Sequence, residues 1–164
     1  MGQDSLIHKG QAREIWLANS ALERGDLKRV DSLMRFYTWD QVAALEGKDQ
    51  AYGMKMLAIS AYYQESFKLS NAYYSILLGL PYLDADAELK ADCFNNRGVN
   101  YEIMGLLDSA YVNYIRSFAY EQQFGDSLGL AQSMINLGIL AGKLGFYSES
   151  VEYLRNAMEF LDPH

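Results

Sequence analysis

Residues 95–114 read NNRGVNYEIMGLLDSAYVNY and contain two glycines, Gly98 and Gly105, within a segment whose apolar residues have helical spacing. A glycine inside a helix costs about 1 kcal/mol relative to alanine, so each glycine needs a structural reason. Gly105 fits a helix end, because glycine readily adopts the left-handed conformation that closes the last turn. Gly98 fits a close approach of two helices, where a larger side chain would clash. The stretch therefore predicts a helix, a tight turn and a second, antiparallel helix.

The same arrangement recurs along the chain, with turn positions assigned at Gly25, Phe67, Gly105 and Gly145. The intervals between these positions are similar but unequal, the second being the shortest, and a small residue lies seven positions before each of them. The small residues are Ala18, Ser60, Gly98 and Gly138. Recurrence at a near-constant period is the sequence signature of a repeat architecture. We therefore predict four helical hairpins over residues 6–46, 50–80, 87–124 and 127–161, with turns after residues 24, 66, 104 and 144.

Composition favours an all-α fold. Half of the residues are apolar, which is enough for a folded core, and the only prolines are Pro81 and Pro163. Runs with the alternating pattern of strands, bounded by turn residues, are absent from the sequence. The expected architecture is a single repeat domain over residues 1–164.

The spacing of small, aromatic, glycine and alanine residues resembles that of the tetratricopeptide repeat (TPR). Asn136-Leu137-Gly138 and the segment 145–150 match it best. The period, roughly 40 residues against the usual ~34 residues, is similar to that of the long-repeat subclass. This subclass includes kinesin light chain, Gαi-binding scaffold proteins and sensor segments of bacterial signalling proteins. The resemblance implies a right-handed superhelical α-solenoid whose first helices line a concave face. Two positions depart from the family pattern: Phe67 replaces a turn glycine, and Arg97 stands where a buried leucine is preferred. Either the stem of Arg97 covers the apolar seam while its charge reaches solvent, or the repeat register is shifted locally.

The resemblance also implies a peptide-binding groove. In the long-repeat subclass, an asparagine two residues before the small position bonds the backbone of an extended peptide. Asn96 and Asn136 occupy this place in the third and fourth units, whereas Trp16 and Ala58 take it in the first two. An amide can both donate to and accept from a peptide group. The groove candidates are Asn95, Asn96, Val99, Glu102, Gln132, Asn136, Ile139 and Lys143. The alternative is that these polar residues are simply solvated.

The sequence points away from catalysis, cofactors and metals. Its only histidines are His8 and His164, its only cysteine is Cys93, and no phosphate loop, nucleophile elbow or zinc motif is present. The net charge is −7 and no stripe of Lys and Arg occurs, which argues against nucleic acid as a partner. The candidate groove also lacks the several basic residues that a clamp for a C-terminal carboxylate needs.

The chain has no apolar run near the ~20 residues of a membrane span. Its compartment stays open between cytoplasm and periplasm, since a leader could have been removed before Gln3. The sequence ends just after the fourth unit, without the polar capping helix that such arrays normally carry. This ending allows a fragment of a longer array, or a homo-oligomer formed through an uncapped C-terminal face.

The leading hypothesis is a protein-interaction module that binds a peptide segment or a partner domain on its concave face. The first alternative is a structural segment that self-associates through its ends. The second is a sensory or regulatory repeat domain of a bacterial signalling protein. A groove containing Asn96 and Asn136 supports the first hypothesis, an exposed apolar end face the second, and a closed pocket between repeats the third.

Overall fold

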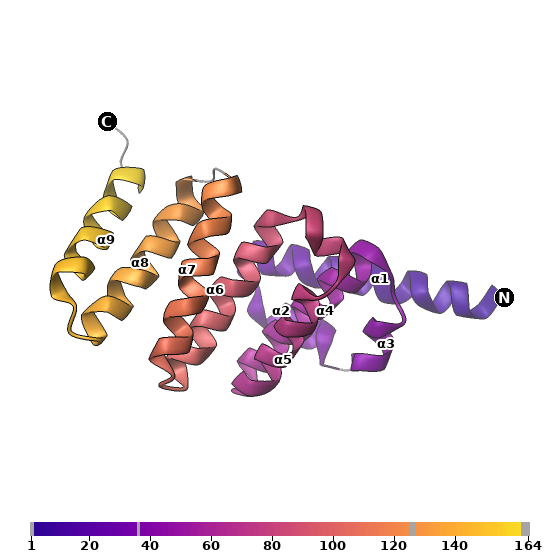
Figure 1. The fold of residues 1–164 in the computed structure, drawn as a ribbon. Coiled ribbons are helices and arrows are strands. Elements are labelled where there is room, and N and C mark those ends of the chain that lie inside the picture. Colours follow the sequence, from indigo (N-terminus) through magenta and orange to yellow (C-terminus); the bar gives the residue numbers. More distant parts are fainter. Residues whose placement is uncertain (1, 36, 125–126, 162–164) are drawn as a thin grey trace. The chain divides into compact units, whose positions relative to one another are not determined.

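The computed structural model describes residues 2–35, 37–124 and 127–161, with side chains described from residue 12 onward except at position 124. Within these ranges every regular element is a helix and no strand occurs (Figure 1). The α-helices are α1 (Gly2–Glu23), α2 (Leu27–Met34), α3 (Trp39–Ala43), α4 (Gly47–Tyr63), α5 (Phe67–Leu78), α6 (Ala87–Ile103), α7 (Leu107–Phe124), α8 (Ser127–Lys143) and α9 (Tyr147–Leu161). A short 3₁₀ helix, η1 (Pro81–Ala85), follows α5. The all-α prediction is confirmed.

The chain consists of two compact units, Met1–Asp84 and Ala85–His164. In the first unit, α4 packs against α1, α2, α3 and α5. In the second unit, α6, α7, α8 and α9 lie side by side in chain order, each in contact with the next (Figure 1). Each unit therefore holds two of the predicted hairpins. The assignment of residues 1–164 to one repeat domain stays a prediction.

The repeat period in the structure is uniform. Helices α4, α6 and α8 begin at Gly47, Ala87 and Ser127, which are equally spaced along the chain, and each contains 17 residues. The second helices of the hairpins begin with the same spacing, at Leu27, Phe67, Leu107 and Tyr147. The unequal intervals inferred from the sequence are therefore wrong, and the error lies in the second hairpin.

The turns explain the error. Four residues with positive φ close the first helix of each hairpin, namely Gly25 (71°), Glu65 (56°), Gly105 (73°) and Gly145 (84°). At each turn, the residue after this one donates its N–H to a carbonyl five positions earlier, as Ser66 does to Ala61 at 2.9 Å and Leu106 to Tyr101 at 2.8 Å. This bond is typical of the Schellman motif. The turn residue of the second hairpin is thus Glu65, and Phe67 is the first residue of α5.

The small packing residues follow the corrected register. They are Ala18, Ala58, Gly98 and Gly138, all buried, so Ala58 takes the place assigned to Ser60. A Cβ added at Gly98 would lie 2.5 Å from Cδ1 of Tyr114, and one at Gly138 would lie 2.8 Å from Cγ of Leu154. Real Cβ atoms do not approach carbon this closely. The prediction that Gly98 permits close helix approach is confirmed.

The helix expected over residues 27–46 is divided, so the described residues contain nine α-helices where eight were expected. Thr38 has an extended backbone and starts α3 with a capping box: its Oγ1 accepts the N–H of Gln41, and the Gln41 side chain accepts the N–H of Thr38 at 2.8 Å. This reciprocal pair satisfies two backbone donors that a continuous helix would have used internally. Val42 of α3 is fully buried and faces Gly53 of α4.

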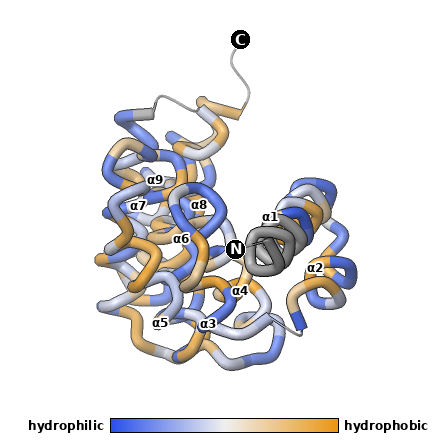
Figure 2. Tube along the Cα trace, turned by 90° about the vertical axis from the view of Figure 1, so that its right-hand side faces the viewer, coloured by the Kyte–Doolittle hydropathy of each residue, from blue (hydrophilic) through white to orange (hydrophobic). Residues whose placement is uncertain are grey.

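Apolar and polar segments alternate along the chain, as the colouring of Figure 2 shows. No described helix is long and apolar enough to span a membrane.

Candidate functional site

The eight groove candidates lie on the first helices of the two hairpins of the second unit. Those on α6 are Asn95, Asn96, Val99 and Glu102, and those on α8 are Gln132, Asn136, Ile139 and Lys143. None of these side chains is buried. Two contacts between α6 and α8, Asn136 with Asn95 and Lys143 with Glu102, hold side chains of the two sets together. The helical spacing used in the sequence analysis therefore brings them onto a shared surface.

Three amides link α6 to α8. Asn136 Nδ2 donates to Asn95 Oδ1 at 2.7 Å, and Gln132 Nε2 donates to Asn136 Oδ1 at 3.2 Å. The structure thus pairs Asn136 with Asn95 rather than with its repeat equivalent, Asn96. The side chain of Asn96 makes no hydrogen bond to the described residues and is partly exposed. Its amide is therefore available for a ligand, while that of Asn136 has one donor and one acceptor already engaged.

An ion pair links the same two helices further along. Lys143 Nζ lies 2.5 Å from Glu102 Oε1, and the Tyr114 hydroxyl of α7 donates to Glu102 Oε2 at 2.6 Å. The Glu102 side chain is 16% exposed and that of Lys143 is 52% exposed. The carboxylate is therefore largely covered by protein, whereas the ammonium group lies at the surface. Each link joins residues 41 positions apart. The two links lie two helical turns apart, about 10 Å along the helices.

Apolar side chains lie between the two links. Ile139 of α8 is about half exposed, and Val99 of α6 is partly buried. The surface has an amide end (Asn95, Asn96, Asn136), an apolar centre and an ion-paired end (Glu102, Lys143), and its charges cancel. We call this surface the α6–α8 strip. It can form hydrogen bonds and apolar contacts, and no group of three metal-binding side chains occurs among the described residues.

The role of Tyr114 in the strip was not predicted from the sequence. This buried tyrosine both packs against Gly98 and holds Glu102 in the strip. The equivalent residue in the fourth repeat is Leu154, so packing at this position needs only an apolar side chain. The hydroxyl group of Tyr114 was therefore the sequence signal that pointed to an additional hydrogen bond.

Arg97 lies where the neighbouring repeats have the buried leucines Leu57 and Leu137. Its side chain is partly buried, with Cζ 6.0 Å from the centroid of the Tyr101 ring. Its Nε is buried without a hydrogen-bond partner among the described residues. The register is not shifted, because the adjacent Gly98 keeps the expected contact. Arg97 therefore covers apolar surface with its stem and stacks its cationic group on an aromatic ring.

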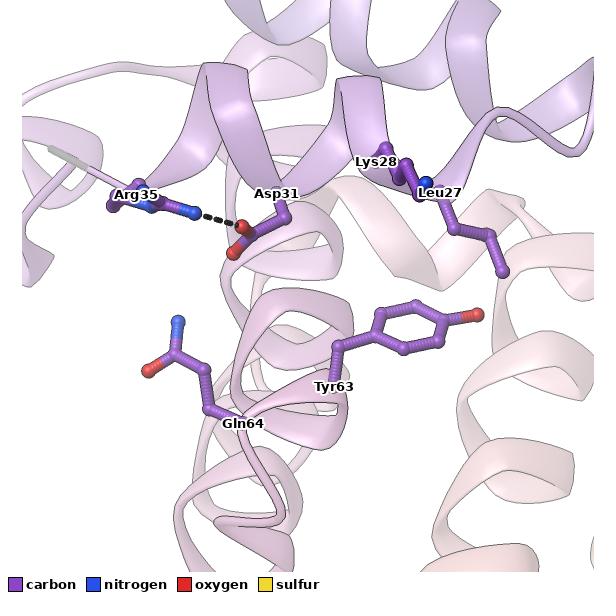
Figure 3. A pocket seen from close by; sticks show the side chains of 6 residues that line it. All are labelled: Leu27, Lys28, Asp31, Arg35, Tyr63 and Gln64. Atoms are coloured by element: carbon purple, nitrogen blue, oxygen red, sulfur yellow. Dashed lines mark hydrogen bonds and ion pairs between the residues drawn. The ribbon is translucent and has the colours of Figure 1, made fainter.

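A second candidate site lies in the first unit, between α2 and the end of α4 (Figure 3). This open cleft has a volume of about 650 Å³ and is lined by Leu27, Lys28, Asp31, Arg35, Tyr63 and Gln64. Arg35 donates to Asp31 at 2.6 Å. Partial burial, and to a lesser degree Tyr62, raises the pKa of the Tyr63 phenol.

Comparison of the two units gives a reason for the cleft. Two repeats later, the positions of Asp31, Arg35 and Gln64 are held by Tyr111, Ile115 and Leu144. Ile115 and Leu144 pack against the core of the second unit. Polar residues replace this packing in the first unit and leave the space open. This cleft was not predicted from the sequence.

No protein-family model and no curated protein sequence matches this chain. Solved structures do resemble it. The structure of BtubC (BKLC) from P. vanneervenii matches with a TM-score of 0.76 and 22% identity, over 92% of this chain and 62% of BtubC. The structure of MamA matches with a TM-score of 0.64 and 15% identity, over 90% of this chain and 75% of MamA. The chain thus spans less than two thirds of the length of BtubC. These similarities show a helical-repeat fold.

Proposed function

We propose that the chain is a protein-interaction module and that the α6–α8 strip binds an extended peptide segment of a partner protein. The observation that carries the proposal is the order of chemistry along the strip: an available amide, an exposed apolar centre and an ion pair. Peptide groups need paired donors and acceptors, which the Asn96 amide offers. Val99 and Ile139 offer apolar contact for one side chain of the peptide. The proposal includes no enzymatic activity, cofactor, metal or nucleic acid.

We also infer that the hairpins are tetratricopeptide-type repeats of the long-repeat subclass. The uniform repeat period, the four small packing residues and the matched turns support this inference. The similarity to MamA, a TPR-type protein, is in keeping with it and with an interaction scaffold.

The function is tested by two substitutions in the strip. A partner recovered by pull-down from the native host would supply the peptide, and calorimetry would give its dissociation constant for each variant. Asn96→Ala removes one hydrogen bond worth about 0.5–1.5 kcal/mol, so binding should weaken roughly two- to thirteen-fold. Ile139→Asp should weaken it further, because a charge replaces the apolar centre. Folding stability should be unchanged in Asn96→Ala, since its amide has no partner to lose.

The matched control is Val112→Asp on α7, a residue as exposed as Ile139 but outside the strip. It should bind like the wild type. Asn136→Ala is a less clear test, because it also breaks the bridge to Asn95. If Asn96→Ala and Ile139→Asp bind the partner as tightly as the wild type does, the strip is not the binding surface.

The cleft in the first unit favours a second candidate, a sensory domain that binds a small ligand. Its walls combine the aliphatic Leu27 and the aromatic Tyr63 with Lys28 and the Arg35–Asp31 ion pair, and Lys28 suits the carboxylate of a small amphipathic ligand. Thermal-shift measurements with such compounds test this candidate. A shift that Lys28→Ala and Tyr63→Ala abolish would support it, and the absence of any shift would leave peptide binding as the better proposal.

A further inference from the structure

A series of contacts between three side chains closes the ion-paired end of the α6–α8 strip. The Tyr114 hydroxyl donates to Glu102 Oε2 at 2.6 Å, and Lys143 Nζ lies 2.5 Å from Glu102 Oε1. Both carboxylate oxygens of Glu102 are therefore engaged. Tyr114 is buried in the core of the second unit, so the series begins at a fixed aromatic ring and ends at an ammonium group on the surface.

The repeat itself does not require this series. Three uncharged residues hold the positions equivalent to Glu102 in the other hairpins, namely Leu22, Tyr62 and Gly142. Leu154 replaces Tyr114 in the fourth hairpin and fills the space beside Gly138 without a hydroxyl group. The packing that the hairpins share therefore does not explain why a hydroxyl, a carboxylate and an ammonium group meet here.

The pairing decides what Lys143 offers to a ligand. An ammonium group has three donors, and Glu102 takes one of them while cancelling the charge. The remaining donors suit an uncharged acceptor, such as the carbonyl oxygen of a peptide group. An unpaired lysine would instead favour a carboxylate, because hydrogen bonds between ionised groups are roughly twice as strong as neutral ones.

The amide end of the strip offers a matching donor. Asn136 Nδ2 gives one N–H to Asn95, and a side-chain amide has two. The links at the two ends lie about 10 Å apart along the helices. An extended peptide rises about 3.3 Å per residue, so carbonyl groups three residues apart span the two donors.

We propose that Tyr114 is a positioning residue: it fixes Glu102 against Lys143, so that the strip binds peptides through their carbonyl groups and does not select an acidic side chain. This inference rests on peptide binding by the strip. Without the Tyr114 hydroxyl, the largely covered carboxylate loses a donor and turns toward water, since a covered charge needs its hydrogen bonds. Lys143 is then unpaired, and the strip prefers acidic peptides.

The probe is a phage-displayed library of random linear peptides, selected on the whole protein at low salt. The wild type should select peptides in which Asp and Glu are no more frequent than in the starting library. Tyr114→Phe and Glu102→Gln should each enrich acidic residues about fivefold, the difference between a charged and a neutral hydrogen bond. Tyr114→Phe combined with Lys143→Gln should return to the wild-type composition, because the effect passes through Lys143.

Stability measurements separate this role from a structural one. Tyr114→Phe keeps the ring that packs against Gly98, and circular dichroism verifies that each variant is folded. A purely structural role for Tyr114 would change stability without changing which peptides are selected. Selection of acidic peptides by the wild type, or of the same peptides by Tyr114→Phe and the wild type, would overturn the proposal.

Ile139→Asp tests the peptide site itself and should lose the peptides that the wild type selects. If it retains them, or if the wild type selects no peptide, the strip is not a peptide site and the role of Tyr114 is rejected with it. If Ile139→Asp loses them while Tyr114→Phe selects as the wild type does, only the positioning role fails. The two failures are therefore distinguishable.

Discussion

Glu65 has a left-handed backbone conformation that favours glycine over a residue with a side chain. Among the described residues it is the only one other than glycine with a positive φ, and Gly25, Gly105 and Gly145 hold the equivalent positions. Its turn keeps the hydrogen bonds of the other three. The antiparallel packing of α4 and α5 therefore imposes the left-handed conformation, and a residue with a Cβ bears a cost of roughly 1 kcal/mol for it.

This cost predicts that Glu65→Gly stabilises the protein by about 0.5–1 kcal/mol. The gain is smaller than the full strain because glycine also increases the conformational entropy of the unfolded chain. The Glu65 side chain is exposed, so its removal sacrifices little packing. The measurement is the free energy of unfolding from urea denaturation. Glu65→Ala is the control and should gain nothing, since alanine keeps the strain. A Glu65→Gly variant less stable than the wild type would show that the side chain stabilises the turn.

At the scale of elements, the division between α2 and α3 was the main error of the sequence analysis. Val30, Met34 and Val42 have spacings that a continuous helix also permits, and all three are buried. The signal that could have revealed the division is the Thr38-x-x-Gln41 pattern of a capping box. Hydrophobic periodicity alone does not contain it, because caps reorganise the backbone without changing which residues are apolar.

The capping box predicts that Thr38→Ala costs about 1 kcal/mol of folding stability. The loss should concentrate in α3, whose first-turn donors would lose their partner. Chemical denaturation gives the total, and hydrogen exchange of α3 amides gives the location. Thr38→Ser keeps the hydroxyl and should retain most of the stability. Equal exchange in the Ala variant and the wild type would show that the docking of Val42, and not the cap, holds α3.

At the scale of the whole molecule, three tyrosines link stability to alkaline pH. Burial, with a hydrogen bond to Glu14, raises the pKa of Tyr37. Burial is also the largest cause of the raised pKa of Tyr63 and of Tyr153. The neighbouring Tyr111 raises the pKa of Tyr153 further. Each phenol thus favours its protonated form more strongly in the folded chain than in the unfolded one.

The sign of the effect follows from this difference. Stability from these groups is fully present below the unfolded tyrosine pKa of about 10 and is lost as the pH rises toward the folded values. We therefore expect the free energy of unfolding to fall between about pH 9 and pH 11. Urea denaturation across this range measures it, and Tyr37→Phe should show a shallower fall. A constant free energy, or the same fall in Tyr37→Phe, would contradict the expectation.

The sequence by itself determined the helical hairpins, the surface on α6 and α8, and the reason for Gly98. These follow from local rules, because apolar spacing selects the buried face of a helix and small residues mark close approach. Only the tertiary structure decided that Asn136 pairs with Asn95 and that Glu65, a residue other than glycine, closes a turn. Each of these depends on how neighbouring helices are offset along their axes. That offset is set by side chains packing between helices, and a repeat pattern read along one chain does not contain it.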